Sequence, residues 1–254
     1  MPKGNWSLFL AVAILLTSCG RNHPAIAPVR HRPEVRRVAP PPPIPLLSGP
    51  GPVARVVYLT VDDGPDPRYT PEVLQILHRY QVPATFFLVG TRILAAPTVA
   101  REIYDDGEAI GNHSFDHIYK HLYHTPLGFL WDVQSDQAVL EKVVGFRPVL
   151  FRAPGGTVGN FVPQDYRILA ALKLHLVGWN VDAGDARWPR PTPQAIVNRV
   201  FRQLQRRPYL WSHSMILMHD SNPETVRALP AIIRLLQANG FRFAKVTPAT
   251  PPAW

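Results

Sequence analysis

The stretch Val56-Val57-Tyr58-Leu59-Thr60-Val61-Asp62-Asp63-Gly64-Pro65 joins a mainly apolar run to two adjacent carboxylates and a turn. A short run of this kind, rich in β-branched residues, predicts a buried strand, and Gly64-Pro65 predicts a turn directly after it. Where the strand turns, both carboxylates can face one cavity, so that one binds a cation while the other takes a proton from water. The alternative is an ordinary Asp-Gly turn with both acids in solvent.

Four further predicted strands also end at polar residues: 108–111 before His113, 149–151 before Arg152, 174–181 before Asp182, and 215–218 before His219. Helical patterns separate these strands, and such alternation is typical of α/β proteins with parallel strands. The carboxyl ends of barrel strands gather in one mouth. We therefore expect an α/β fold, a distorted, incomplete (β/α) barrel of parallel strands with the site at the strand C-terminal ends.

Apolar spacing, together with helix start and stop residues, predicts the helices. Thr70 is expected to cap the first helix, with Pro71 at its first position, and Thr192 to cap a later one. The other predicted helices cover 98–104, 127–143 (ending at Gly145), 163–173, 193–205 and 224–238, and two further strands cover 84–89 and 241–246.

Two histidines four residues apart, His113 and His117, suit a single metal ion, because on a helical turn they would share one face. Asp63 adds a hard oxygen ligand, and three ligands of these types leave positions open for water and substrate. His121 and His124 lie close by and are either surface residues or alternative ligands.

The remaining clusters can supply charge and protons. Arg152 can hold a carboxylate bidentately and keep it ionised, and backbone amides near Gly155 can meet a developing oxyanion. His219 can protonate a leaving amine, or it can be an edge-of-core histidine paired with Asp220. The Asp182–Asp185 turn lies between two tryptophans, at 179 and 188, which suits either carbohydrate binding or an ordinary capped loop.

The N-terminal residues have the pattern of an export signal. A basic start and a short apolar run from Leu8 to Leu16 precede Leu16-Thr17-Ser18-Cys19, and small residues before a cysteine resemble a bacterial lipobox. We expect a signal peptide over 1–18 and lipidation at Cys19, and thus an exported protein of the bacterial cell envelope anchored to a membrane by lipid. The alternative is a simple secretory peptide with an unrelated cysteine.

Residues 19–54 are expected to be a lipid anchor and basic linker, because prolines at 40–43, 45, 50 and 52 favour an extended chain. Residues 1–54 carry six Lys/Arg and one Glu, which leaves +4 of the net charge of +9 for the predicted catalytic domain at 55–250 and the residues after it. This modest charge fits attraction to anionic envelope polymers, and we expect no nucleic acid partner. The single cysteine excludes an intrachain disulfide framework, and the oligomeric state is not predicted.

Taken in order, these stretches resemble the five motifs of the polysaccharide deacetylase family, also called the NodB-homology or carbohydrate esterase family 4 domain. Thr-x-Asp-Asp-Gly-Pro at 60–65 and Gly-Asn-His-Ser-x-x-His at 111–117 are specific as a pair, and Leu-x-His-Asp at 217–220 agrees in order. The resemblance implies that a divalent metal, most often zinc but also cobalt or another ion, is bound by Asp63, His113 and His117.

The same resemblance implies roles for other residues. Asp62 would be the general base, paired with Arg152, and His219 the general acid, oriented by Asp185. Two residues would line the substrate pocket: Gly155, whose amide meets the oxyanion, and Leu217, which meets the acetyl methyl. The substrate would be an acetylated glycan polymer containing N-acetylglucosamine, such as peptidoglycan, poly-N-acetylglucosamine or a chitin oligomer.

The chain departs from the family pattern in three places. The family usually has an aromatic residue at the position of Gly155, and a tryptophan directly after the second Asp of the fourth motif, where Ala186 stands. Residues 205–211 look inserted. We therefore expect altered groove walls, and two competing functions remain: an O-acetyl polysaccharide esterase of the same mechanism, and a non-catalytic glycan-binding lipoprotein.

Overall fold

The computed structural model describes residues 43–49 and 54–253. The predicted signal peptide, Cys19 and most of the predicted linker lie outside these residues, so the anchor stays a prediction. Within the described part of the chain, no helix has both the length and the apolar character needed to cross a membrane.

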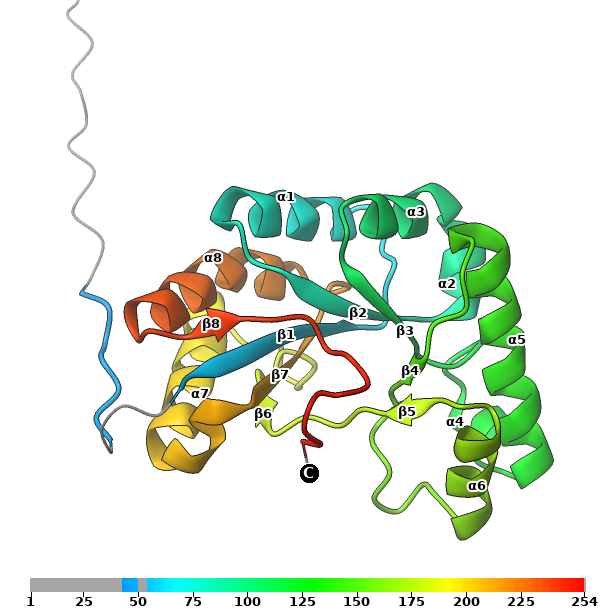
Figure 1. The fold of residues 1–254 in the computed structure, drawn as a ribbon. Helices are drawn as coiled ribbons and strands as arrows, with labels where there is room; N and C mark the ends of the chain where they lie inside the picture. Colours follow the sequence, from blue (N-terminus) through cyan, green and yellow to red (C-terminus); the bar gives the residue numbers. More distant parts are fainter. Residues whose placement is uncertain (1–42, 50–53, 254) are drawn as a thin grey trace, which may run out of the picture. The chain divides into compact units, whose positions relative to one another are not determined.

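A parallel sheet forms the centre of the fold (Figure 1). Its strands are β1 (Val56–Asp62), β2 (Ala84–Leu88), β3 (Ala109–Asn112), β4 (Leu150–Phe151), β5 (His175–Leu176), β6 (Val181–Asp182), β7 (Ser214–His219) and β8 (Arg242–Phe243). The order is β5-β4-β3-β2-β1-β7-β6, and β8 pairs with the start of β1. The end strands β5 and β6 do not pair with each other, so the barrel is open, and the predicted incomplete (β/α) barrel is confirmed.

The opening of the barrel corrects one sequence prediction. Residues 174–181 were expected to form one strand, but β5 pairs with β4 and β6 pairs with β7, on opposite sides of the gap. Between them, the carbonyls of Val177 and Gly178 accept from a side chain: Arg152 donates through Nη2 to Gly178 O at 2.7 Å and through Nε to Val177 O at 3.3 Å. A buried guanidinium therefore bridges the place where a complete barrel would have continuous strands.

Helices cover the outside of the sheet (Figure 1). They are α1 (Thr70–Tyr80), α2 (Gly90–Ala95), α3 (Pro97–Asp105), α4 (Tyr119–Leu122), α5 (Pro126–Val144), α6 (Pro163–Ala171), α7 (Pro193–Arg206) and α8 (Pro223–Ala238), with a 3₁₀ helix at Pro208–Ser212. The short α2, α4 and 3₁₀ helix were not predicted. Strand β8 and helix α6 are shorter than expected.

The two predicted helix caps have different outcomes. Thr192 does cap α7, because its hydroxyl accepts from the Ala195 amide at 3.2 Å. Thr70 is not a cap: α1 already begins at this residue, and its buried hydroxyl accepts from the Asp66 amide and donates to Asp220. This threonine thus ties α1 to the end of β7.

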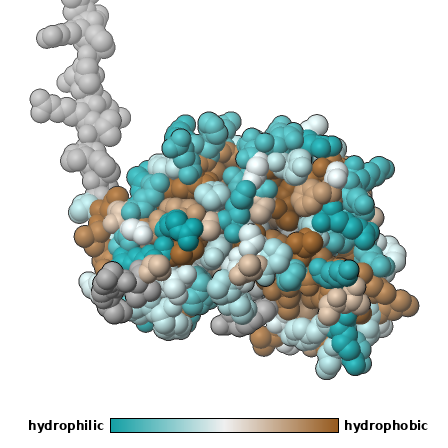
Figure 2. All heavy atoms as spheres, in the orientation of Figure 1, coloured by the Kyte–Doolittle hydropathy of each residue, from teal (hydrophilic) through white to brown (hydrophobic). Residues whose placement is uncertain are grey.

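The core lies between the sheet and its outer helices, where fully buried residues such as Phe86, Ile216 and Leu236 pack together. Apolar residues are not confined to the interior: Figure 2 shows apolar side chains between hydrophilic ones on one face, and Leu127 and Val158 are well exposed.

In the stretch 205–211, Leu210 and Trp211 belong to this core, whereas Arg206, Arg207 and Tyr209 are exposed. The Trp211 side chain is fully buried, donates through Nε1 to Leu204 O at 2.8 Å, and carries the Arg55 guanidinium 4.1 Å from its ring. No residue of 205–211 lines the cavity at the carboxyl ends of the strands, so the expectation that this stretch alters the groove wall is wrong for that cavity.

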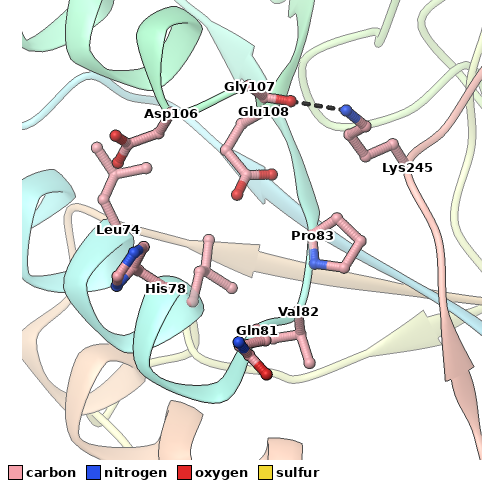
Figure 3. A pocket seen from close by; sticks show the side chains of 10 residues that line it. Leu74, His78, Gln81, Val82, Pro83, Asp106, Gly107, Glu108 and Lys245 are labelled. Atoms are coloured by element: carbon pink, nitrogen blue, oxygen red, sulfur yellow. Dashed lines mark hydrogen bonds between the residues drawn. The ribbon is translucent and has the colours of Figure 1, made fainter.

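A cavity of about 410 Å³ lies at the amino ends of β2 and β3, away from Asp62 (Figure 3). The Glu108 side chain points into it, and Glu108 Oε2 accepts from the Ala84 amide at 2.6 Å. On the rim, Lys245 Nζ donates to Gly107 O at 2.7 Å (Figure 3). Burial raises the pKa of Glu108 to about 7, although the Ala84 hydrogen bond opposes this shift.

Because the folded state favours protonated Glu108, its contribution to stability falls as pH rises from about 4.5 to about 7. Glu108→Gln keeps an acceptor for the Ala84 amide and removes the titration. We expect the substitution to raise the melting temperature at pH 8, by roughly 2–4 °C after allowing for solvent screening, and to change it little at pH 5. Thermal unfolding of both proteins across this range tests the assignment, which an equal effect at both pH values would contradict.

Candidate active site

A cavity of about 370 Å³ opens at the carboxyl ends of the strands. Seven of the predicted site residues line it: Asp62, Asp63, His113, His117, Gly155, Leu217 and His219. The other two predicted site residues, Arg152 and Asp185, are buried behind this wall. The cavity is no larger than the one around Glu108, so it is distinguished by its side chains.

Asp63, His113 and His117 place one ligand atom each within 4.8 Å of one another, and they form the only such group of three in the described residues. Asp63 Oδ1 lies 3.5 Å from His113 Nε2 and 3.2 Å from His117 Nε2. His113 Nδ1 lies 2.8 Å from Arg152 O, a carbonyl that can only accept, so Nδ1 carries the proton and Nε2 is left to bind a metal.

The charge states of Asp63 and His117 also fit a cation. Burial alone would raise the pKa of Asp63, but a hydrogen bond and charge from His113 hold it below its usual value. Burial and the neighbouring His113 lower the pKa of His117. An ionised carboxylate and a neutral imidazole are the forms that metals bind, so the set fits a divalent cation that accepts one oxygen and two nitrogen ligands.

The two histidines do not share a helical turn, which corrects the sequence prediction. They lie on the loop after β3, where Ser114 and His117 have left-handed backbone angles, with φ of 73° and 59°. Two aspartates of α5 form hydrogen bonds with this loop. Asp136 accepts from the His113 amide at 3.2 Å, and Asp132 accepts from the Phe115 amide at 2.7 Å.

The alternative ligands His121 and His124 do not line the cavity. His121 Nδ1 lies 2.7 Å from the Asp116 carboxylate, at the surface of the loop.

Asp62 is oriented by the buried Arg152. Arg152 Nη1 donates to Asp62 Oδ1 at 2.8 Å and to Thr60 Oγ1 at 2.6 Å. The other Asp62 oxygen, Oδ2, lies 3.7 Å from His113 Nε2. One oxygen is thus fixed by the arginine, and the other faces the candidate metal position.

His219 is paired with Asp185, and not with the adjacent Asp220. His219 Nδ1 lies 2.9 Å from Asp185 Oδ1, while Asp185 Oδ2 accepts from the His219 amide at 2.7 Å and from Thr225 Oγ1 at 2.6 Å. Burial alone would lower the pKa of His219, but the hydrogen bond and charge of Asp185 raise it to about 9. Asp220 is buried on the far side and accepts from Thr70.

Five further residues outside the predicted catalytic, metal and pocket set also line the cavity: Tyr119, Trp179, Gly184, Ala186 and Arg187. Of these, only Trp179 was linked to carbohydrate binding from the sequence. Asp182, the other acid of the fourth motif, lines the cavity as well, but its carboxylate is engaged by Arg199 at 3.0 Å. Trp188 is almost completely exposed and is not among the lining residues. Tyr119 follows His117 by two residues, and this proximity was the only sign of it in the sequence.

Comparison with known proteins agrees with this geometry. The sequence pattern described as "Polysaccharide deacetylase" matches residues 50–176. A peptidoglycan-N-acetylglucosamine deacetylase of Bacillus cereus is 33% identical over 196 residues, which cover 76% of this chain and 87% of the relative. A chitooligosaccharide deacetylase of Azorhizobium caulinodans is 33% identical over 201 residues, covering 73% and 90%.

Among solved structures, the catalytic domain of a peptidoglycan N-acetylglucosamine deacetylase from Eubacterium rectale superposes with a TM-score of 0.71 at 29% identity, covering 82% of this chain and 94% of that one. The sequence match, the parallel half-barrel and the Asp-His-His cluster at its mouth agree with one another. The chain therefore belongs to the polysaccharide deacetylase family.

Proposed function

We propose that the protein is a metal-dependent hydrolase that removes N-acetyl groups from a glycan containing N-acetylglucosamine, such as peptidoglycan or a chitooligosaccharide. The observation that carries this proposal is the Asp63-His113-His117 cluster in one cavity with the Arg152-bound Asp62 and the Asp185-bound His219. Both relatives named above act, by their names, on acetylated amino sugars.

Asp63, His113 and His117 would hold the cation, and zinc suits this mixture of one oxygen and two nitrogen ligands. When bound, the ion would supply Lewis-acid polarisation of the acetamide carbonyl and acidify the attacking water. All other steps use side chains and amides of the chain itself.

Asp62 is placed to take the proton from the attacking water, because its Oδ2 faces the candidate metal position while Arg152 holds its Oδ1. The Gly155 amide is proposed to donate to the oxyanion. His219 is proposed to protonate the departing amine, since Asp185 keeps the imidazole charged at neutral pH. Leu217 forms an apolar part of the cavity wall and is proposed to receive the acetyl methyl. The products would be acetate and a free amino sugar.

Export and lipid anchoring are a separate part of the proposal, supported by the lipobox-like Leu16-Thr17-Ser18-Cys19 and the proline-rich stretch after it. In a bacterial host, Cys19→Ser is expected to abolish labelling by a fatty-acid probe and to move the protein from the membrane to the soluble fraction. Ser18→Ala is a suitable control because it keeps a small residue before the cysteine. Unchanged labelling and membrane retention in the Cys19 variant would contradict the anchor.

Acetate release from chitooligosaccharides and from peptidoglycan tests both the metal requirement and the role of Asp62 as general base. The chelated protein should be inactive and should recover with one equivalent of zinc. Asp62→Asn should lower kcat by about 10²–10⁴-fold because it removes the general base. The exposed Asp105→Asn on α3 is a matched control that should keep full activity.

Two results would overturn this mechanism: activity that ignores chelation, or full activity of Asp62→Asn. A panel of acetate esters beside the amides separates deacetylation from O-acetyl esterase activity. Binding of glycan without turnover, and without stoichiometric metal, would instead identify a binding protein.

The role of His219 predicts a pH dependence. An acid must be protonated to act, so a pKa of about 9 keeps kcat/KM high up to about that pH. Asp185→Asn removes the charge that raises the pKa, and the alkaline limb of the pH profile should therefore move to lower pH. Profiles of kcat/KM for the two zinc-loaded proteins test this shift. Loss of activity with an unmoved alkaline limb would show that His219 is not the acid.

A further inference from the structure

The space beside Gly155 is already occupied by another side chain. Gly155 has a left-handed φ of 69°, and a Cβ added there would overlap Tyr119 Oη and lie 2.9 Å from Tyr119 Cζ. Real Cβ atoms do not approach other atoms so closely. Either residue 155 carries a side chain or the Tyr119 hydroxyl occupies this position, but both cannot do so in this arrangement.

Tyr119 is braced from two directions although about half of it is exposed. Its ring lies 5.8 Å from the His117 ring and makes an edge-on contact with Tyr123 at 5.7 Å. Tyr123 in turn donates to Pro154 O at 2.8 Å. The ring is therefore held between the loop that carries the metal ligands and the turn that carries Gly155.

The Tyr119 hydroxyl has no hydrogen-bond partner in the protein among residues 43–49 and 54–253, whereas the hydroxyl of Tyr123 is satisfied by a backbone carbonyl. Tyr119 lines the same cavity as Asp63, His117 and Gly155. A phenol is a hydrogen-bond donor at neutral pH, and one that lines a substrate cavity without a protein partner is available to a ligand.

We infer that Tyr119 is a substrate-binding residue, whose hydroxyl stands where residue 155 has no side chain and donates a hydrogen bond to the acetylated sugar. The inference rests on the proposed function, since it assumes that the cavity binds an acetylated amino sugar. It also accounts for the glycine at position 155, because a larger residue would compete with Tyr119 for one space.

The first test is Tyr119→Phe, which removes the hydroxyl and keeps the ring. For zinc-dependent acetate release from a chitooligosaccharide, we expect kcat/KM to fall about tenfold, the effect of one lost hydrogen bond. Zinc affinity and melting temperature should stay unchanged. The matched control is Tyr104→Phe on α3, whose side chain is similarly exposed and packs on Phe146 outside the cavity; it should match the wild type.

The second test is a double-mutant cycle between positions 119 and 155. Gly155→Ala should lower kcat/KM at least tenfold in the wild-type background and markedly less in a Tyr119→Ala background, where the space is free. Backbone strain at residue 155 is the same in both backgrounds and therefore cancels from the comparison.

The outcomes separate this inference from the proposed function. If the zinc-loaded wild type releases no acetate from any acetylated glycan, the proposed function fails. If the wild type is active but Tyr119→Phe equals it, or the effects at positions 119 and 155 are independent, the role of Tyr119 is overturned while the deacetylase stands. Lower zinc affinity in Tyr119→Phe would also overturn it, because the hydroxyl would then act on the metal loop.

Discussion

The hydrogen bonds of the buried Arg152 guanidinium join the fold to the site. The side chain contacts Thr60 and Asp62 on β1 and the carbonyls of Val177 and Gly178 in the barrel opening. A charge with no exposure to solvent is costly unless nearly all of its donors are satisfied and an opposite charge is adjacent. Arg152 meets both conditions only if β1, β4 and the segment after β5 stand at their observed separation.

The same residue sets the geometry of the chemistry. Arg152 fixes one oxygen of Asp62 through its side chain, and its own backbone carbonyl accepts the hydrogen bond from His113 Nδ1. One residue thus orients the candidate base and determines the tautomer of a candidate ligand. Removing it would leave a buried carboxylate without its partner, a change that typically costs about 3–5 kcal/mol, so stability and function cannot be separated at this position.

The sequence predicts the strands better than the turns between them. The apolar run of β1 and the amphipathic pattern of α7 depend on local periodicity, which one sequence displays directly. The split of 174–181 into β5 and β6 does not, because Arg152 and the opposite edges of the sheet decide it over long range. The same limit applies to His113 and His117: their spacing correctly indicates that they lie together as candidate ligands, but left-handed residues on a loop bring them together, and not a helix.

The features that the sequence did not predict depend on contacts between residues that lie far apart in the chain. Thr70 reads as a helix cap because its neighbours in sequence suggest one, yet its hydroxyl is used by Asp220, 150 residues away. Gly155 reads as a lost aromatic residue when the third motif is considered alone. In the folded chain the space beside it contains Tyr119, which lies two residues after the second motif, so a gap in one motif is filled by a neighbour of another. Side chains from several motifs share one cavity wall. A departure from the family pattern in one motif can therefore be compensated by a residue near another motif, which a comparison of each motif by itself does not reveal.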